Sequence, residues 1–342
     1  MSVKSWLSCS LMIVMVFAVH SQAAERPRLV VLTDIGGDPD DQQSLIRLMV
    51  YSNEFEIEGL IASASGTPGE LKEAQTRPDL IREIVTAYGQ VRDNLVRHAE
   101  GWPETEKLLN VIKSGNSNRG REHIGDGQDT AASKWLAERI DAGTAERPLN
   151  IAIWGGQTDL AQALWQVKSI QGDAGLKEFV KKFRVFDIAD QDNIADWMRT
   201  EFPGMFYILS NARSMHDKRE ASFRGMYLTG DETLTSRAWI DQNVRSTGQL
   251  GTLYPTRTWT APNEHSCMKE GDSPSWFFFL PIGGNHPSDP TQPGWGGQYV
   301  KTSEGWYRDR YENEGDPRES VSRWRAAFQA DFARRMNWCR GE

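Results

Sequence analysis

The sequence is poor in cysteine, with three in 342 residues. Cys9 lies near the N-terminus, and Cys267 and Cys339 lack the Cys-x-x-Cys spacing of a zinc or dithiol redox site. In an oxidising compartment these last two could form a disulfide that links the C-terminal helix to the loop before Gly271. Two unrelated thiols are an equally good interpretation, so the pairing stays open.

Positive charge is also scarce: 39 Lys+Arg stand against 47 Asp+Glu, a formal net charge of -8. This balance argues against a nucleic-acid partner, because a phosphate backbone favours a basic surface. The mix of apolar and aromatic residues excludes low complexity and general disorder. The 13 Trp are the unusual surplus, and they indicate either a large core or aromatic platforms for a ligand.

Long hydrophobic runs are missing except near the start of the chain. Residues 7–19 are mostly apolar, Lys4 precedes them and the small residues 21–24 follow. This pattern predicts a cleavable signal peptide over residues 1–24 and a secreted or periplasmic protein. A membrane anchor is the alternative, but the run is shorter than the ~20 residues that a spanning helix needs. Because no linker or internal repeat follows, we expect residues 25–342 to form a single domain without a membrane span.

Strand-like and helix-like segments alternate over the first two thirds of the chain. The pattern predicts strands at 28–33, 55–62, 149–154, 183–188 and 205–209. Helices are predicted at 42–51, 70–88 (with a break or new start at Pro78), 130–140, 158–167 and 319–338. This order indicates the α/β class: a mainly parallel open sheet with helices on both faces. Residues 211–310 are rich in Gly, Pro and Trp, and we expect long irregular loops there.

Four carboxylates follow the first predicted strand within eight residues: Asp34, Asp38, Asp40 and Asp41. The carboxyl ends of parallel strands are where ligands bind in open α/β sheets. Because crowded carboxylates repel, a cation is the natural compensation, and oxygen ligands without His or Cys favour Ca²⁺ or Mg²⁺ over zinc. A solvated helix-capping turn, an EF-hand loop and an aspartyl-nucleophile phosphatase are the alternatives. Gly36 breaks the acid spacing that the last two require.

The segment VVLTDIGGDPDD (residues 30–41) resembles the N-terminal signature D-T-D-x-G-x-D-D of the inosine-uridine-preferring nucleoside hydrolases. Leu32 replaces the first acid, and two residues are inserted before the final Asp pair. This version is similar to a secreted branch, the nucleoside-hydrolase-like domain associated with cellulose-binding proteins. The segments GDSPS (271–275) and PGWGGQY (293–299) resemble late motifs of the same branch. The resemblance implies a nucleoside-hydrolase-like fold.

The resemblance also implies a metal site. The family holds one Ca²⁺, so Ca²⁺ is expected here ahead of Mg²⁺. Asp34 and Asp41 match its two loop ligands, and Thr158 in GGQTDLA (155–161) matches a carbonyl ligand. Asp272 matches the late Asp ligand, although Gly271 replaces the His that precedes it in the family. Asp34 resembles the catalytic base, and Asp40 resembles the catalytic-site Asp that hydrogen-bonds a sugar hydroxyl. From the residues alone, Thr158 is also interpreted as a helix cap and Asp272 as a surface turn residue.

Further substrate contacts are predicted with less specific signals. Gln191, Asp192 and Asn193 follow a strand where the family has a sugar-contacting segment, and His123 lies in a loop similar to the family motif H-G-x-x-G. A loop that only caps a helix would show the same pattern around His123. Trp295 is a candidate to stack on a sugar or base, although a Trp is more often part of a core.

These features favour a Ca²⁺-dependent hydrolase that cleaves a glycosyl bond with metal-positioned water and Asp34 as base. The expected substrate is a small sugar or nucleoside-like compound, or a glycoside from plant cell-wall polysaccharide. The alternative is a non-catalytic secreted carbohydrate- or cellulose-binding protein on the same scaffold. A metal-dependent phosphatase is a weaker third hypothesis, and a homo-oligomer is an open expectation.

Overall fold

The structure is a computed structural model that describes residues 25–65, 74–213, 218–258, 263–311 and 315–341. The predicted signal peptide, residues 1–24, lies outside the described residues. Within the described ranges, none of the helices has the length and apolar character needed to cross a membrane.

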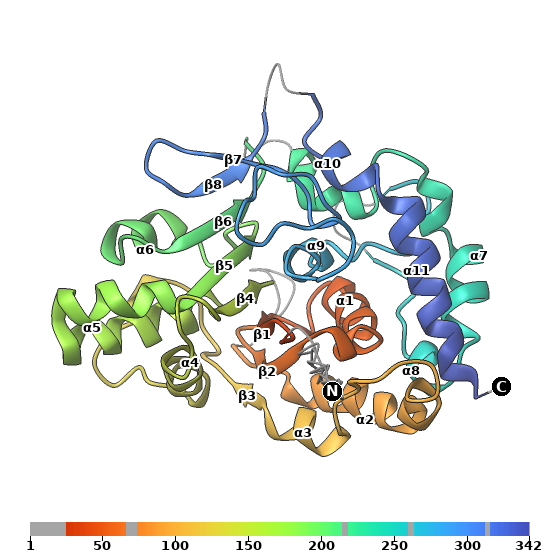
Figure 1. The fold of residues 1–342 in the computed structure, drawn as a ribbon, viewed down its shortest axis with the longest axis horizontal. Helices are drawn as coiled ribbons and strands as arrows, with labels where there is room; N and C mark the ends of the chain where they lie inside the picture. The colour runs from red at the N-terminus through yellow and green to blue at the C-terminus, as the bar shows by residue number, and fades with distance from the viewer. Residues whose placement is uncertain (1–24, 66–73, 214–217, 259–262, 312–314, 342) are drawn as a thin grey trace, which may run out of the picture.

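One sheet of eight strands runs through the molecule in the order β3-β2-β1-β4-β5-β6-β8-β7 (Figure 1). Every neighbouring pair is parallel except β7 and β8, which are antiparallel. The predicted α/β class with a mainly parallel sheet is therefore confirmed. The strands are β1 (Arg28–Thr33), β2 (Glu56–Ala62), β3 (Ile112–Ser114), β4 (Leu149–Ile153), β5 (Phe183–Ile188), β6 (Phe206–Ser210), β7 (Tyr299–Lys301) and β8 (Tyr307–Asp309).

Helices cover both faces of this sheet (Figure 1). Helices α4, α5 and α6 lie on one face, and α1, α2, α9 and α11 lie on the other. The α-helices are α1 (Asp40–Met49), α2 (Pro78–Leu95), α3 (Thr105–Asn110), α4 (Ala131–Asp141), α5 (Gln157–Phe179), α6 (Ala195–Glu201), α7 (Arg237–Ile240), α8 (Gln249–Thr252), α9 (Ser273–Phe277), α10 (Glu319–Ser322) and α11 (Arg325–Asn337).

The apolar run of β1 explains why the sheet is covered on both faces. Successive side chains of a strand point to opposite faces. Leu29 and Val31 accordingly join the core under α1, α2 and α11, and Val30 and Leu32 join a second core under α4 and α5. A strand that is apolar at every position therefore needs helices on each face, as parallel sheets generally do.

Several predicted boundaries differ from the observed ones. Helix α2 starts at Pro78, where a fixed φ suits the first turn, while the predicted start at residues 70–73 lies outside the described residues. The predicted helix 158–167 is longer, because α5 continues to Phe179 across a kink at Gly172 (φ 68°). The predicted helix 319–338 divides into α10 and α11.

The predicted irregular region, residues 211–310, contains short helices and the strands β7 and β8 rather than loops alone. Three-residue strands carry too little periodicity to be recognised in a sequence. Cys267 and Cys339 are both buried free thiols, so the disulfide interpretation is not the one that the structure supports.

Candidate functional site

The acidic loop connects the carboxyl end of β1 to α1. Gly36 adopts a positive φ of 113°, and a Cβ atom there would come within 2.5 Å of Ser65 Oγ, so the loop packs closely on the segment after β2. Asp40 and Asp41 occupy the first turn of α1, where the helix dipole stabilises carboxylates. Thr33 donates a hydrogen bond from Oγ1 to Asp41, which orients that carboxylate toward the strand end.

Three carboxylates converge beside this turn. One oxygen each from Asp40, Asp41 and Asp272 lie within 4.8 Å of one another. Asp272 is 3% exposed, and its buried Oδ2 has no hydrogen-bond partner among the described residues. Burial, reinforced by neighbouring carboxylates, raises the pKa of Asp41 and of Asp272 well above the ordinary value. A buried carboxylate cluster with one unpartnered oxygen fits a hard divalent cation.

Asp34 lies next to this cluster but is paired with Arg119. Its Oδ2 is 2.6 Å from Arg119 Nη2, and the residue is 5% exposed. Burial raises the pKa of Asp34 to about 6, with Arg119 opposing and Asp40 adding to the shift. Gly155, in the turn after β4, packs directly on this carboxylate, since a Cβ there would lie 2.8 Å from both Cβ and Cγ of Asp34.

A buried lysine compensates the other side of the cluster. Lys269 Nζ lies 2.6 Å from Asp38 Oδ2 and 2.9 Å from Asp40 Oδ2. Burial alone would lower the pKa of Lys269, but Asp40 and Asp38 raise it above the ordinary value, so the amine stays charged. Burial raises the pKa of Asp40, and Lys269 opposes that shift.

Helix α1 also positions the segment that carries Lys269 and Asp272. Gln43 donates from Nε2 to the carbonyl of Cys267 at 2.7 Å and accepts from the backbone N of Lys269 at 2.8 Å. Arg47 forms a fully buried ion pair with Glu270, including a 3.1 Å bond from Nη2 to Oε1. Asp40, Asp41 and Asp272 meet because one helix holds both its own acids and this segment.

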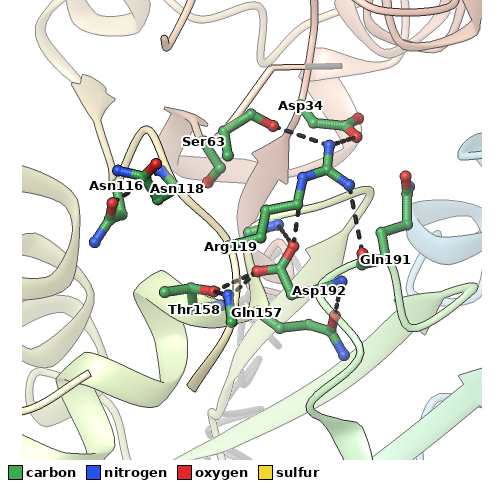
Figure 2. Close-up of polar contacts among 12 residues, drawn as sticks. Asp34, Ser63, Asn116, Asn118, Arg119, Gln157, Thr158, Gln191 and Asp192 are labelled. Atoms are coloured by element: carbon green, nitrogen blue, oxygen red, sulfur yellow. Dashed lines mark hydrogen bonds and ion pairs between the residues drawn. The ribbon is translucent and has the colours of Figure 1, made fainter. Parts of the chain in front are cut away.

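The segment around Thr158 connects the loops after β3 and β5 (Figure 2). Gly156, not Thr158, is the N-cap residue of α5, so the interpretation of Thr158 as the cap is wrong. Thr158 instead donates from Oγ1 to Asp192 Oδ2 at 2.7 Å and accepts from Gly120 N at 2.9 Å. Its role as a carbonyl ligand stays a prediction.

The remaining predicted contacts are divided between the site and other regions. Gln191 and Asp192 lie beside Arg119 (Figure 2). The side-chain amide of Gln191 donates to the carbonyl of Trp154. Asn193 is exposed with a φ of 56°. His123 is partly exposed in the 3-10 turn Arg121–His123. Among the described residues, neither Asn193 nor His123 forms a hydrogen bond with the carboxylate cluster.

Trp295 lies in a core. It is 8% exposed, and its ring packs 5.8 Å from Phe277 and 6.2 Å from Phe328, measured between centroids. Its predicted contact with a sugar or base is therefore without support from this packing, and the buried Trp154 and Trp276 likewise contribute to a core.

Sequence reasoning missed Arg119 and Lys269, two cations that form ion pairs with acids of the site. Lys269 is three residues before Asp272, and its closeness in sequence to a predicted metal ligand could have marked it as a residue of the site. Arg119 lies 85 positions from Asp34, and nothing in the sequence pattern connects the two.

The fold and the site together define a nucleoside-hydrolase-like α/β protein. Residues 28–299 match the family model described as cellulose-binding Sde182, nucleoside hydrolase-like domain, and the chain belongs to this family. A solved structure is similar: a nucleoside hydrolase-related hypothetical protein from Saccharophagus degradans, associated with carbohydrate metabolism. It is 31% identical with a TM-score of 0.76, over 93% of this chain and 73% of that chain. No functionally curated protein matches.

Proposed function

We propose that the protein is a secreted or periplasmic Ca²⁺-dependent hydrolase that cleaves a glycosyl bond. The observation that carries this proposal is the unpartnered, buried Oδ2 of Asp272, placed beside Asp40 and Asp41. A buried carboxylate oxygen without a donor costs free energy in the fold unless a cation compensates it. The family and the similar carbohydrate-associated protein support a sugar-containing substrate.

The residues present fit a divalent cation with oxygen ligands. Asp41 and Asp272 would hold it with carboxylate oxygens, and Asp34 and the carbonyl of Thr158 complete the set that the family resemblance implies. Ca²⁺ suits such a set better than Mg²⁺, because it accepts more oxygen ligands in a less strict geometry. Bound there, the cation would polarise a water molecule and the hydroxyls of a sugar.

The chemistry of the protein side chains follows from their charges. Cleavage of a glycosyl bond passes through a cationic sugar and needs a base for the attacking water. Asp34 would take the proton from that water on a carboxylate oxygen, with Arg119 holding its Oδ2. Asp40 would accept a hydrogen bond from a sugar hydroxyl while Lys269 orients it from the other side.

The leaving group is less restricted to a nucleoside base than the family resemblance suggests. Gly271 replaces the His that the nucleoside hydrolases carry, and a Cβ at this position would lie 3.2 Å from the ring of Phe223 and 3.5 Å from Asp40 Oδ2. Because no side chain projects here, the nucleoside base loses one of its contacts. A glycoside from plant cell-wall polysaccharide is therefore a proposed substrate alongside a nucleoside.

A non-catalytic carbohydrate-binding role is the second candidate, and one observation favours it. The proposed base is shielded, since Asp34 is 5% exposed and ion-paired with Arg119. On this hypothesis the acid cluster is a structural metal site. Retention on cellulose or xylan without turnover of any glycoside would favour binding over hydrolysis.

A panel of nucleosides and aryl glycosides, assayed with added Ca²⁺, tests the hydrolase. We expect release of free base or reducing sugar, abolished by EDTA and by Asp34→Ala. The matched control is Asp79→Ala, which removes another aspartate paired with an arginine, on the exposed start of α2. Full activity in Asp34→Ala would refute the proposed base.

A further inference from the structure

Resting on the proposed metal site, we propose that Arg119 is a built-in counter-cation that weakens Ca²⁺ binding by neutralising Asp34. Its side chain reaches from the loop after β3 to three other strand ends (Figure 2). Nη2 donates to Asp34 Oδ2 at 2.6 Å and to the carbonyl of Ala64 at 3.0 Å. Nη1 donates to the carbonyl of Gln191 at 3.4 Å, and Nε lies 3.9 Å from Asp192 Oδ1.

The loop that presents Arg119 is anchored on both sides of it. Asn116 N donates to Asp159 Oδ1 at 2.8 Å, and Gly120 N donates to Thr158 Oγ1 at 2.9 Å. Gly120 has a φ of 107°, a backbone conformation that residues other than glycine rarely adopt. Both anchors belong to the first turn of α5, so the guanidinium is held over Asp34 by the scaffold.

The acids of the site are not all paired with cations. Asp34 is paired with Arg119, and Asp38 and Asp40 share Lys269. Asp41 and Asp272 contact neither cation in any ion pair found among the described residues. A divalent ion would therefore be held most strongly by this remaining pair, and the charges of Arg119 and Lys269 would both repel it.

Removing the charge of Arg119 should therefore strengthen metal binding. The pair is little exposed, with 12% of the Arg119 side chain and 7% of Asp34 accessible, so solvent screens it weakly. For charges a few ångströms apart in such surroundings, we expect about tenfold to hundredfold tighter Ca²⁺ binding by Arg119→Met. A purely structural role predicts the opposite sign, because a loosened site would bind Ca²⁺ more weakly.

Calorimetric titration of the purified protein with Ca²⁺ at pH 8 measures this directly. Arg119→Met should bind Ca²⁺ at least about tenfold more tightly than the wild type. Arg119→Lys keeps the charge and should stay near the wild-type affinity. The matched control is Arg92→Met. Arg92 lies on α2, and like Arg119 it contacts both a carboxylate, that of Glu104, and backbone carbonyls.

Each outcome is informative. Unchanged or weaker Ca²⁺ binding by Arg119→Met, in a wild type that binds Ca²⁺, would overturn the role of Arg119 and leave the proposed metal site standing. Absence of Ca²⁺ binding by the wild type would overturn both. If Arg119→Met does not fold by circular dichroism, Arg119→Gln replaces it, because a neutral side chain with donors retains part of the bridging while losing the charge.

Discussion

Asp192 accepts two hydrogen bonds from Thr158, a 2.8 Å bond from the backbone N and a 2.7 Å bond from Oγ1. Since Thr158 Oγ1 also accepts from Gly120 N, one hydroxyl joins the β5 loop, α5 and the loop that carries Arg119. We expect Thr158→Val, nearly isosteric, to leave both partners without this hydroxyl and to lower the free energy of unfolding by about 1–3 kcal/mol in urea titrations.

The control for this change is Thr200→Val. Thr200 is an exposed residue of α6 whose Oγ1 donates to the Asp196 carbonyl at 2.9 Å, so its loss should change stability by less than about 0.5 kcal/mol. Equal effects of the two substitutions would contradict a connecting role for Thr158.

Metal dependence should be visible in stability as well as in activity. Ca²⁺ at a hundredfold excess over its Kd is expected to stabilise the wild type by about 2.7 kcal/mol. Asp272→Asn should remove this response. It should also make the metal-free protein more stable, because burial raises the pKa of Asp272 well above its ordinary value and the ionised form is disfavoured in the fold.

Thermal unfolding with EDTA or with CaCl2 checks both expectations, the lost Ca²⁺ response and the higher stability of the metal-free variant. Asp309→Asn is the matched control, since it removes another buried acid with a raised pKa that lies outside the cluster. It should keep the full Ca²⁺ response. A Ca²⁺ response that survives in Asp272→Asn would be inconsistent with Asp272 as a ligand.

Gly155 tests how precisely Asp34 must be placed. An added methyl group would lie 2.8 Å from Cβ and Cγ of Asp34, so the carboxylate must shift. We expect Gly155→Ala to reduce turnover of the glycoside found in the substrate panel by about 10²-fold. Overpacking should also cost about 1–3 kcal/mol of stability.

Gly59→Ala is the comparison for Gly155→Ala, because its methyl group would meet Val30 at 3.0 Å in the core, away from the carboxylates. It should lose stability without a specific loss of turnover. If Gly59→Ala loses as much turnover as Gly155→Ala for the same loss of stability, close packing on Asp34 is not what turnover depends on.

The sequence was sufficient for the fold because its strands are strongly apolar. The predicted strands 28–33 and 183–188 match β1 and β5, which are hydrogen-bonded on both sides in the centre of the sheet. Three strands at or next to the edges of the sheet were missed: β3, β7 and β8. Each is three residues long, and their pairing depends on tertiary contacts that no local pattern records.

The candidate site was only partly predictable for a similar reason. Asp34, Asp40 and Asp41 are close in sequence and follow one strand, so the position of the strand end places them together. Arg119 and Lys269 contact those acids from 85 and 229 or more positions away. Such long-range ion pairs depend on how loops fold over the sheet, and their spacing in the sequence carries no periodic signal.

Stability should depend on pH through Asp309. Burial raises the pKa of this carboxyl to about 7, against hydrogen bonds from Ser222 and Ser210 that oppose the shift. The folded state therefore keeps a proton that the unfolded chain loses above about pH 4, and stability falls as pH rises from about 4 to 7. Asp309→Asn should remove up to about 1.4 kcal/mol per pH unit of this slope in urea titrations.

Asp289→Asn provides the contrasting control for Asp309. Asp289 is partly exposed, and hydrogen bonds from Thr291 and Gln292 lower its pKa. Its stabilising contribution is therefore constant between about pH 4 and 7 and is lost only as the pH falls below the ordinary carboxyl range. If Asp309→Asn leaves the slope between pH 4 and 7 unchanged, the proton on Asp309 is not what makes stability depend on pH there.

The buried ion pair between Arg47 and Glu270 should be essential to the placement of Asp272. Both side chains are fully buried, and Tyr254 donates a further bond to Glu270. Glu270→Gln leaves the guanidinium uncompensated, and we expect a loss of about 3–5 kcal/mol in unfolding free energy together with a reduced Ca²⁺ response. The double variant Arg47→Met/Glu270→Gln should lose less than the sum of the single losses, because it removes both charges together. Strictly additive losses in urea titrations would mean that the two charges do not depend on each other.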